Sequence, residues 1–129
     1  MTGVTVAGGA PARAAAQSGA IVSADACTAN NLAANDDSSS SQVALPFTLN
    51  FYGRNYNSLW VNNNGNVTFT GPLSTFTPFG LIAANTPIIA PFFADVDTRG
   101  NGSNPVQYGY GSTVYEGRPA FCVNWVDVG

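Results

Sequence analysis

The sequence predicts an all-β fold, either an antiparallel β-sandwich or a partly open barrel, with about six or seven short strands. Apolar residues alternate with polar ones over short runs, which is the period of a strand with one covered face. Residues that favour turns separate these runs at intervals of about 8–12 residues, as is typical of sandwiches. No long run repeats its apolar residues at the helical period of about 3.6 residues. The chain has 129 residues, enough for one domain.

Residues 1–41 predict a flexible, low-complexity leader, followed by a β domain at 42–129. The leader is rich in Ala, Gly, Ser and Asn and has little apolar periodicity. Small residues from Ala14 to Ala20 are typical of the end of an export signal, but a basic start and a continuous apolar stretch are missing. The leader is therefore interpreted as a remnant of such a signal, and no apolar segment is long enough to span a membrane.

The first expected strand covers 45–51, where apolar residues occupy every second position, and it ends at Gly53. A β-hairpin is expected next, with strands around 59–61 and 67–69. Asn-Gly between alternating runs is a strong hairpin signal, because both residues tolerate the positive φ of a tight turn. A polar ladder that binds glycans is the alternative role for the asparagines, although a turn explains them without a ligand. The residues that reverse the chain are Asn62, Asn63, Asn64 and Gly65.

The second half of the chain predicts further strands. Glycine and proline interrupt the segment 71–87, which is expected to be irregular. The apolar run 88–96 predicts a strand covered on both faces, and Pro91 predicts that this strand is bent or lies at an edge. Because the last run is strand-like almost to Gly129, we expect the domain to continue beyond it, since an unpaired final strand promotes aggregation. The remaining strands are expected at 106–110, 113–115 and 120–128.

The composition excludes several classes of function. Charged residues form only 9% of the chain, so amides and hydroxyls must supply most of the polar surface. The net charge is -3 and lysine is absent, so no basic patch is available to bind nucleic acid. The absence of histidine excludes Ser-His-Asp and Cys-His catalysis within these residues. The cations are Arg13, Arg54, Arg99 and Arg118.

Cys27 and Cys122 are expected to form a disulfide, because two cysteines in a β protein rich in Asn, Thr and Gly are typical of an exported domain. Two free buried cysteines are the alternative. A metal site fits least well, since two sulfurs without histidine or further cysteines do not complete a tetrahedral shell. A disulfide between them would enclose most of the chain.

Three blocks of sequence resemble the nidogen-like extracellular domain, NIDO. The blocks are FYGRNYNSLWVNNNGNVTF at 51–69, TPIIAPFFADVDTRG at 86–100 and AFCVNWVDVG at 120–129. They occur in the order found in the family, and the resemblance covers about residues 45–129. It implies a β-rich extracellular module of which this chain holds the N-terminal part. Cys27 lies ahead of the matching region, so the disulfide does not follow from the resemblance.

The resemblance implies a secreted adhesion or matrix-interaction module that binds an extracellular protein or glycan surface without catalysis or a cofactor. Arginine without lysine, together with abundant Ala, Gly and Asn, suggests a GC-rich bacterial genome, so we expect a secreted bacterial member. The alternative function is a carbohydrate-binding module of a larger secreted hydrolase. A fragment of a glycosidase is a third interpretation.

Asp95 and Asp97 form the only close pair of carboxylates in a region expected to be ordered. A strand would place both side chains on one face, about 7 Å apart. With Arg99 they are interpreted as an ion-pair cluster. A calcium site formed by Asp95, Asp97 and Asn101 is the alternative, because hard oxygen ligands precede a glycine turn, although the helix-loop-helix calcium motif is not matched. The pair would also suit a glycosidase.

Exposed aromatic side chains are the expected contacts with a partner. Tyrosine and tryptophan combine a large apolar surface with a polar group, which suits both protein interfaces and sugar stacking. The period of two places Tyr52 and Trp60 opposite the apolar set, so we expect both to be partly exposed. Packing within the core and on the sheets is the alternative role. The candidate contacts are Tyr52, Trp60, Tyr108 and Tyr110.

Overall fold

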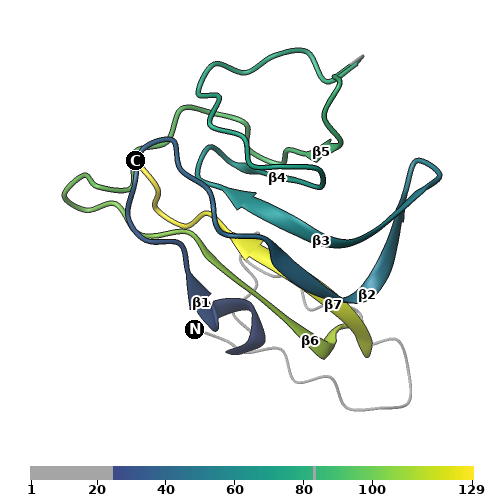
Figure 1. The fold of residues 1–129 in the computed structure, drawn as a ribbon. Helices are drawn as coiled ribbons and strands as arrows, with labels where there is room; N and C mark the ends of the chain where they lie inside the picture. The colour runs from purple at the N-terminus through teal and green to yellow at the C-terminus, as the bar shows by residue number, and fades with distance from the viewer. Residues whose placement is uncertain (1–24, 83) are drawn as a thin grey trace.

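The computed structural model describes residues 25–82 and 84–129, apart from the side chains of 112–114, and these residues form two antiparallel sheets packed as a β-sandwich (Figure 1). A short 3-10 helix, η1 (Asp25–Thr28), precedes the strands. One sheet has the order β1-β6-β7 and the other the order β2-β3-β4-β5. The predicted all-β sandwich is confirmed, and no helix in this part of the chain is long and apolar enough to cross a membrane. The strands are β1 (Asn30–Asn31), β2 (Val43–Phe51), β3 (Arg54–Asn62), β4 (Asn66–Thr68), β5 (Ile88–Ile89), β6 (Gln107–Tyr115) and β7 (Arg118–Asn124).

The core lies between the sheets and follows the period-2 pattern of the sequence. On β3, Leu59 and Val61 are buried while Trp60 between them is only partly buried. Val67 pairs with Val61 across the hairpin and is also buried, so the two strands present one apolar face. Burying one such aliphatic side chain stabilises the fold by about 1.5–3 kcal/mol. The other buried members of the core are Leu32, Leu45, Phe69 and Val106.

Gly65 lets the hairpin between β3 and β4 turn tightly beneath the chain that follows β5. Its φ is +79°, and the three asparagines before it do not have a positive φ. A Cβ atom at this position would lie 1.5 Å from the backbone oxygen of Phe92. The amide of Phe92 donates to the Gly65 carbonyl oxygen at 3.2 Å, so the two backbones are in direct contact. The position therefore requires glycine for its conformation and for its lack of a side chain.

Gly65→Ala is expected to destabilise the protein more than Gly53→Ala, although both glycines have a φ of +79°. No atom lies within 4 Å of a Cβ built on Gly53, so that substitution adds only backbone strain of about 1 kcal/mol. At Gly65 the same strain is joined by a clash with backbone, and we expect a loss of about 3 kcal/mol or more. Urea unfolding of the two variants measures the difference. Equal losses would contradict the close contact at Gly65.

The expected strand at 88–96 is a strand only at Ile88–Ile89, which pairs with β4. Pro91 has no amide to donate to a sheet. The amides of Phe92 and Ala94 donate instead to carbonyl oxygens in the β3–β4 turn, at 3.2 and 3.3 Å. The segment therefore leaves the sheet, because its amides donate to the β3–β4 turn and not to a neighbouring strand.

The three-stranded sheet holds η1 through a disulfide. The strands expected at 106–110 and 113–115 are one strand, β6, whose register against β7 is irregular. The predicted disulfide between Cys27 and Cys122 is present, with the two Cα atoms 5.3 Å apart. A Cβ atom on Gly109 would lie 1.7 Å from a backbone oxygen of η1, so β6 and η1 are in close contact. The disulfide thus fixes the start of the described chain to β7.

Residues 25–41, which the composition assigns to the leader, lie on the sandwich. The amides of Leu32 and Ser40 each donate at 2.8 Å, to the carbonyl oxygens of Val106 and Val61 respectively. These contacts join positions far apart in the sequence, which local composition does not reveal. The expected export signal falls on residues outside the described part of the chain. The boundary between leader and domain stays a prediction.

Candidate functional site

Four buried asparagines at the β3–β4 turn organise the loops at one end of the sandwich. Buried amides need hydrogen-bond partners, and in the described residues every buried side-chain nitrogen or oxygen has one. Burial at this level leaves the amides inaccessible to a glycan. We call these residues the asparagine cluster: Asn62, Asn63, Asn64 and Asn66, with exposed fractions of 0, 1, 1 and 0%.

Asn63 connects two segments that are distant in the sequence. Its side-chain amide donates to the carbonyl oxygens of Asn35, Asp36 and Val96, at 3.1, 2.6 and 2.6 Å. Its side-chain oxygen accepts a hydrogen bond from the hydroxyl of Thr98 at 3.3 Å. One side chain thus donates to backbone carbonyl groups of two segments that are far apart in the sequence.

The neighbouring asparagines hold two further segments. The amide of Asn64 donates to a carboxylate oxygen of Asp37 at 2.8 Å. The side-chain oxygen of Asn62 accepts from the hydroxyl of Ser39 at 2.6 Å and from the amide of Leu73 at 3.0 Å. These hydrogen bonds, and not a tolerance of positive φ, account for the asparagines in this turn. The sequence predicted the turn but not this role, because the partners in segments 35–39 and 96–98 lie more than 20 positions away in the sequence.

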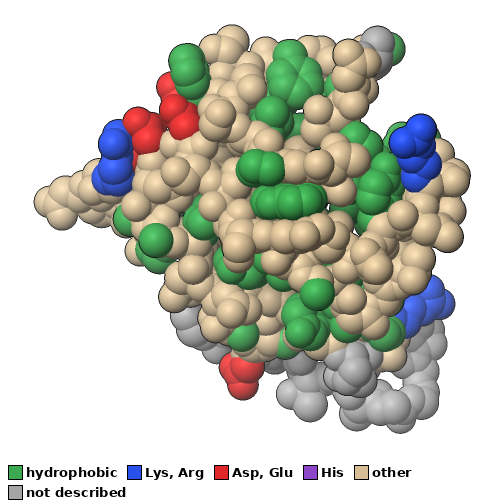
Figure 2. Space-filling view, viewed as in Figure 1, with side chains coloured by type: hydrophobic (Ala, Val, Ile, Leu, Met, Phe, Trp, Pro, Cys, Tyr) green, Lys and Arg blue, Asp and Glu red, His purple; other side chains and the backbone are tan. Residues whose placement is uncertain are grey.

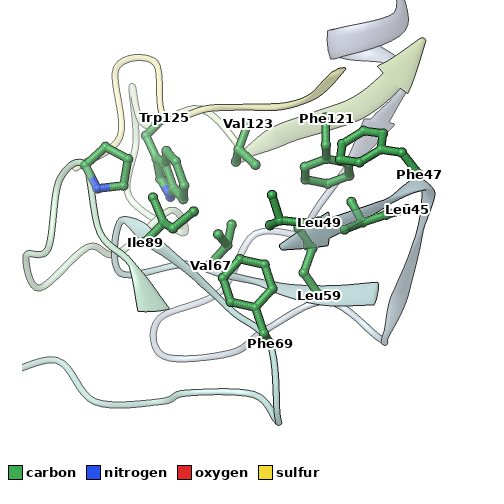
Figure 3. Close-up of a pocket in the computed structure, with 11 residues that line it drawn as sticks. Leu45, Phe47, Leu49, Leu59, Val67, Phe69, Ile89, Phe121, Val123 and Trp125 are labelled. Carbon is green, nitrogen blue, oxygen red and sulfur yellow. The ribbon is translucent and has the colours of Figure 1, made fainter. Parts of the chain in front are cut away.

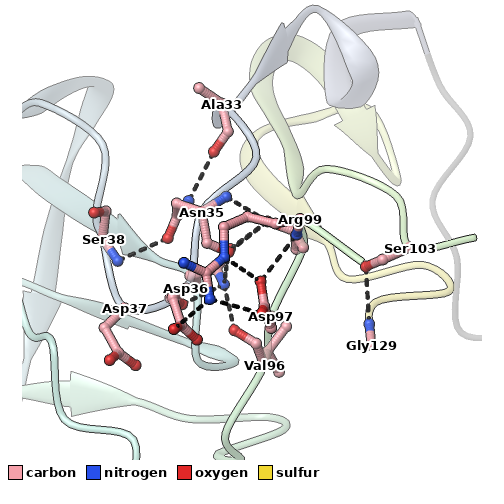
Figure 4. Close-up of polar contacts among 12 residues, drawn as sticks. Ala33, Asn35, Asp36, Asp37, Ser38, Val96, Asp97, Arg99, Ser103 and Gly129 are labelled. Carbon is pink, nitrogen blue, oxygen red and sulfur yellow. Dashed lines mark hydrogen bonds and ion pairs between the residues drawn. The ribbon is translucent and has the colours of Figure 1, made fainter. Parts of the chain in front are cut away.

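Arg99 lies at the centre of an ion-pair network beside the turn (Figure 4). Its Nε lies 2.7 Å from Asp97 Oδ1, and its Nη2 lies 2.6 Å from Asp36 Oδ2. Of the predicted group Asp95, Asp97 and Arg99, the structure joins Asp97 to Arg99, and Arg99 takes Asp36 as its second carboxylate. Asp95 makes no ion pair within the described residues. Asp36 is 63 positions from Arg99, so no local pattern signalled this contact.

Hydrogen bonds from the side chain and the backbone amide of Arg99 lower the pKa of Asp97 from its ordinary value of 3.8 to about 2. The side-chain hydrogen bond to Asp97 in turn raises the pKa of Arg99 above its ordinary value. The general acid of a glycosidase needs a raised pKa, so the shift at Asp97 has the opposite direction. Asp97 therefore does not fit that acid's role.

Asp97→Asn is expected to lower stability near neutral pH and to have no effect near pH 2. The folded-state pKa of Asp97, about 2, lies below the ordinary value of 3.8. The stabilisation is therefore complete above pH ~4 and disappears as the pH falls through ~2. Both side chains are exposed, so concentrated salt is expected to shrink the effect. Urea unfolding of the original chain and of Asp97→Asn between about pH 2 and about pH 7 measures the effect. A difference in the free energy of unfolding between the two proteins that does not change with pH would contradict the ion pair.

Three carboxylates gather next to this network. Oxygens of Asp36, Asp37 and Asp95, here called the acidic cluster, lie within 4.8 Å of one another. Of the predicted calcium ligands, Asp95 belongs to the acidic cluster and Asp97 is held by Arg99. Asn101 is exposed in the loop that follows. Calcium binding stays a prediction.

If calcium binds, it is expected to raise the thermal midpoint, because a cation would offset the repulsion between the carboxylates. Asp95→Asn is expected to abolish the rise. Thermal unfolding in calcium and in chelator measures both effects. The same thermal midpoint in calcium and in chelator would refute calcium binding at this site.

The predicted partner contacts differ in exposure. Tyr52 is 93% exposed and Tyr110 is 48% exposed. Trp60 and Tyr108 are partly buried, and the ring of Tyr108 lies against Phe121 with centroids 6.2 Å apart. Figure 2 shows apolar side chains spread over one face of the molecule. The other large exposed apolar side chains are Phe76, Phe79, Leu81, Ile82, Ile89, Phe92 and Tyr115.

An apolar cleft of about 300 Å³, here called the β7 cleft, lies between β7 and the four-stranded sheet (Figure 3). Phe121 and Val123 of β7 line one side, together with Trp125. The indole N–H of Trp125 donates to the backbone oxygen of Asn63 at 3.2 Å, which ties this end of the cleft to the asparagine cluster. The period of two in the expected strand 120–128 places these three side chains on one face, but it gives no sign of a hollow. The opposite lining is Leu45, Phe47, Leu49, Leu59, Val67, Phe69, Ile89 and Pro91.

A family model matches most of this chain, and curated relatives match about half of it. A family model described as NIDO related matches residues 13–129. The chain is 44% identical to alpha-tectorin of Mus musculus and 42% identical to alpha-tectorin of Homo sapiens, each over 62 residues. Each match covers 47% of this chain and 3% of the relative, so the chain spans a small part of these relatives. No solved structure matches the chain.

Proposed function

Because this chain belongs to the NIDO-related family, we propose that it is a secreted extracellular module that binds a protein of the matrix or of a cell surface and catalyses no reaction. The family match over residues 13–129 is the observation that carries this proposal. The similarity to alpha-tectorin supports it. The disulfide between Cys27 and Cys122 fits an oxidising compartment outside the cytosol.

Tyr52 is the first candidate for contact with the partner. It is 93% exposed at the β2–β3 turn and has a φ of +49°, which is uncommon for a bulky side chain. The turn is braced, because the amide of Gly53 donates to the side-chain oxygen of Asn50 at 3.3 Å. Strained and exposed residues concentrate at functional positions, and aromatic residues are frequent hot spots of interfaces. Tyr52 is therefore proposed as a contact residue.

Binding of the folded chain to a panel of purified matrix proteins tests the proposal. Tyr52→Ala and Tyr110→Ala are each expected to weaken binding by about tenfold. Tyr115→Ala is the matched control, because Tyr115 is a tyrosine at the end of β6 whose exposure, 64%, lies between those of Tyr110 and Tyr52. Absence of saturable binding to any protein would overturn the proposed function. Equal effects of all three substitutions would remove Tyr52 and Tyr110 as the contacts.

The alternative, a carbohydrate-binding module, rests on the exposed tyrosine rings, which can stack on sugars. Affinity on a glycan array that vanishes in Trp60→Ala or Tyr110→Ala, without binding to matrix proteins, would favour it. The glycosidase interpretation requires hydrolysis that is lost in Asp95→Asn. A bacterial source and a continuation of the domain beyond Gly129 stay predictions.

A further inference from the structure

We propose that Asn101 is a site of spontaneous deamidation, a covalent change that turns an uncharged side chain in an exposed loop into a carboxylate without an enzyme. The chain has a second Asn-Gly pair, Asn64-Gly65, and the fold protects that pair. The inference concerns the chemistry of one loop and does not depend on the proposed function.

The reaction requires only the chain and water. The backbone nitrogen of the residue after asparagine attacks the side-chain carbonyl carbon, and the new C–N bond closes a five-membered succinimide. The side-chain nitrogen leaves as ammonia and takes the proton of the attacking amide. Water then opens the ring at one of its two carbonyl carbons and gives aspartate or isoaspartate. Glycine after asparagine favours the attack, because it has no Cβ atom to hinder the approach of its nitrogen.

Asn101 and Gly102 are the two central residues of an exposed turn. The amide of Ser103 donates to the carbonyl oxygen of Gly100 at 3.1 Å and closes the turn around them. Both central residues are exposed to water, and Figure 1 shows the loop that leads into β6 projecting from the sandwich. Opening this turn breaks a single hydrogen bond, so the backbone reaches the geometry of attack at a low cost in free energy.

The two reacting groups of this turn are not held by other groups. Within residues 25–82 and 84–129, neither the side chain of Asn101 nor the backbone amide of Gly102 makes a hydrogen bond. Gly102 has a φ of +91°, and no atom lies within 4 Å of a Cβ built on it. The side-chain carbonyl carbon and the attacking nitrogen are therefore free to approach each other.

Asn64-Gly65 is the same pair in the opposite surroundings. Asn64 is 1% exposed, its side-chain oxygen accepts from the amide of Val96 at 2.9 Å, and its side-chain nitrogen donates to Asp37 at 2.8 Å. The carbonyl oxygen of Gly65 accepts from the amide of Phe92 at 3.2 Å, so the backbone of the pair is held as well. Attack at this pair requires several hydrogen bonds to break in a buried turn, which the folded chain permits only by local unfolding.

The loop that carries Asn101 is anchored on both sides, so we expect the fold to survive the modification. Before it, Thr98 is 3% exposed and its amide donates to the carbonyl oxygen of Asn35 at 2.9 Å. After it, the amide of Asn104 donates to the carbonyl oxygen of Asp127 at 3.0 Å. Either product adds a negative charge to a net charge of -3, and isoaspartate also lengthens the backbone by a methylene group. The modified chain therefore differs in surface charge and loop shape.

The test incubates the oxidised, folded chain in mildly alkaline buffer and follows both Asn-Gly pairs by peptide mass spectrometry. Water labelled with a heavy oxygen isotope marks each hydrolysed ring, and fragmentation that distinguishes aspartate from isoaspartate identifies the products. Asn101 is expected to react at least about tenfold faster than Asn64. In concentrated urea with the disulfide reduced, the two asparagines are expected to react at similar rates, because the fold no longer protects Asn64.

Three variants assign the reaction to this pair. Gly102→Ala is expected to slow the reaction at Asn101 by at least about tenfold, because a Cβ atom hinders the attacking nitrogen. Gly100→Ala is the matched control, because a Cβ on Gly100 meets only the backbone oxygen of Asp97 at 3.9 Å and its nitrogen does not attack. It is expected to leave the rate unchanged. Asn101→Gln is expected to leave the loop unmodified over the same incubation, since its longer side chain must close a six-membered ring. Circular dichroism checks that all three variants are folded.

Four results would overturn the inference. They are an unmodified Asn101 in the folded chain when a short peptide of the same sequence reacts, equal rates at Asn64 and Asn101 in the folded chain, aspartate as the sole product, or equal slowing by Gly100→Ala and Gly102→Ala. Binding to a matrix protein plays no part in these measurements, so they and the proposed function fail independently.

Discussion

Asn63→Ala is expected to lower the free energy of unfolding by about 3–5 kcal/mol, a large effect for a polar residue in a turn. Asn63 is 1% exposed, and its amide donates to the carbonyl oxygens of Asn35, Asp36 and Val96. Alanine would leave these oxygens without that donor and would open a cavity beside them. Urea unfolding measures the loss.

Two further variants separate the hydrogen bonds from general effects of substitution. Asn63→Asp keeps the size of the side chain but removes the donor and adds a buried charge, so it is expected to be at least as damaging as alanine. Asn57→Ala is the control, because Asn57 is exposed on the same strand, and its effect is expected to stay within about 0.5 kcal/mol. Similar losses for Asn57→Ala and Asn63→Ala would refute the role given to Asn63.

Reduction of the disulfide between Cys27 and Cys122 is expected to lower the free energy of unfolding by up to roughly 4.7 kcal/mol, the chain-entropy value for a loop of this length. The two cysteines are 95 positions apart, so the cross-link restricts most of the unfolded chain. Reduction also releases η1 from β7, because Cys27 lies in η1 and is fully buried.

Urea unfolding with and without reductant measures the contribution of the disulfide. The double variant Cys27→Ser with Cys122→Ser is the control. Its midpoint of urea unfolding is expected to equal that of the reduced protein and to be the same with and without reductant. If reductant leaves the midpoint of the original chain unchanged while its thiols become titratable, the disulfide does not stabilise the fold.

The strands of the β2–β4 region were predictable because their signal is local. Alternation around Leu59, Val61 and Val67 marks one face of two strands, and the residues between them mark the turn. The end of β5 was not predictable, because it depends on hydrogen bonds from the segment after Pro91 to a turn more than 20 residues earlier. The apolar run 88–96 was expected to be covered on both faces, and this was wrong, because Ile89 is 41% and Phe92 is 53% exposed.

The candidate site was only partly predictable for the same reason. The asparagines were recognised as turn residues, but their partners lie in segments that only the fold brings together. Asp97 and Arg99 are two positions apart and were recognised, whereas the contact of Arg99 with Asp36 spans 63 positions. The β7 cleft belongs to two sheets at once, and no pattern within one strand reveals it.

The most direct test of the account is a binding titration of the oxidised, folded chain against purified proteins of the extracellular matrix. The account predicts saturable binding to at least one of them, loss of this binding when the chain is reduced and unfolded, and no chemical change in the bound protein. A correctly folded, oxidised chain that binds none of them, or that cleaves what it binds, would contradict the account.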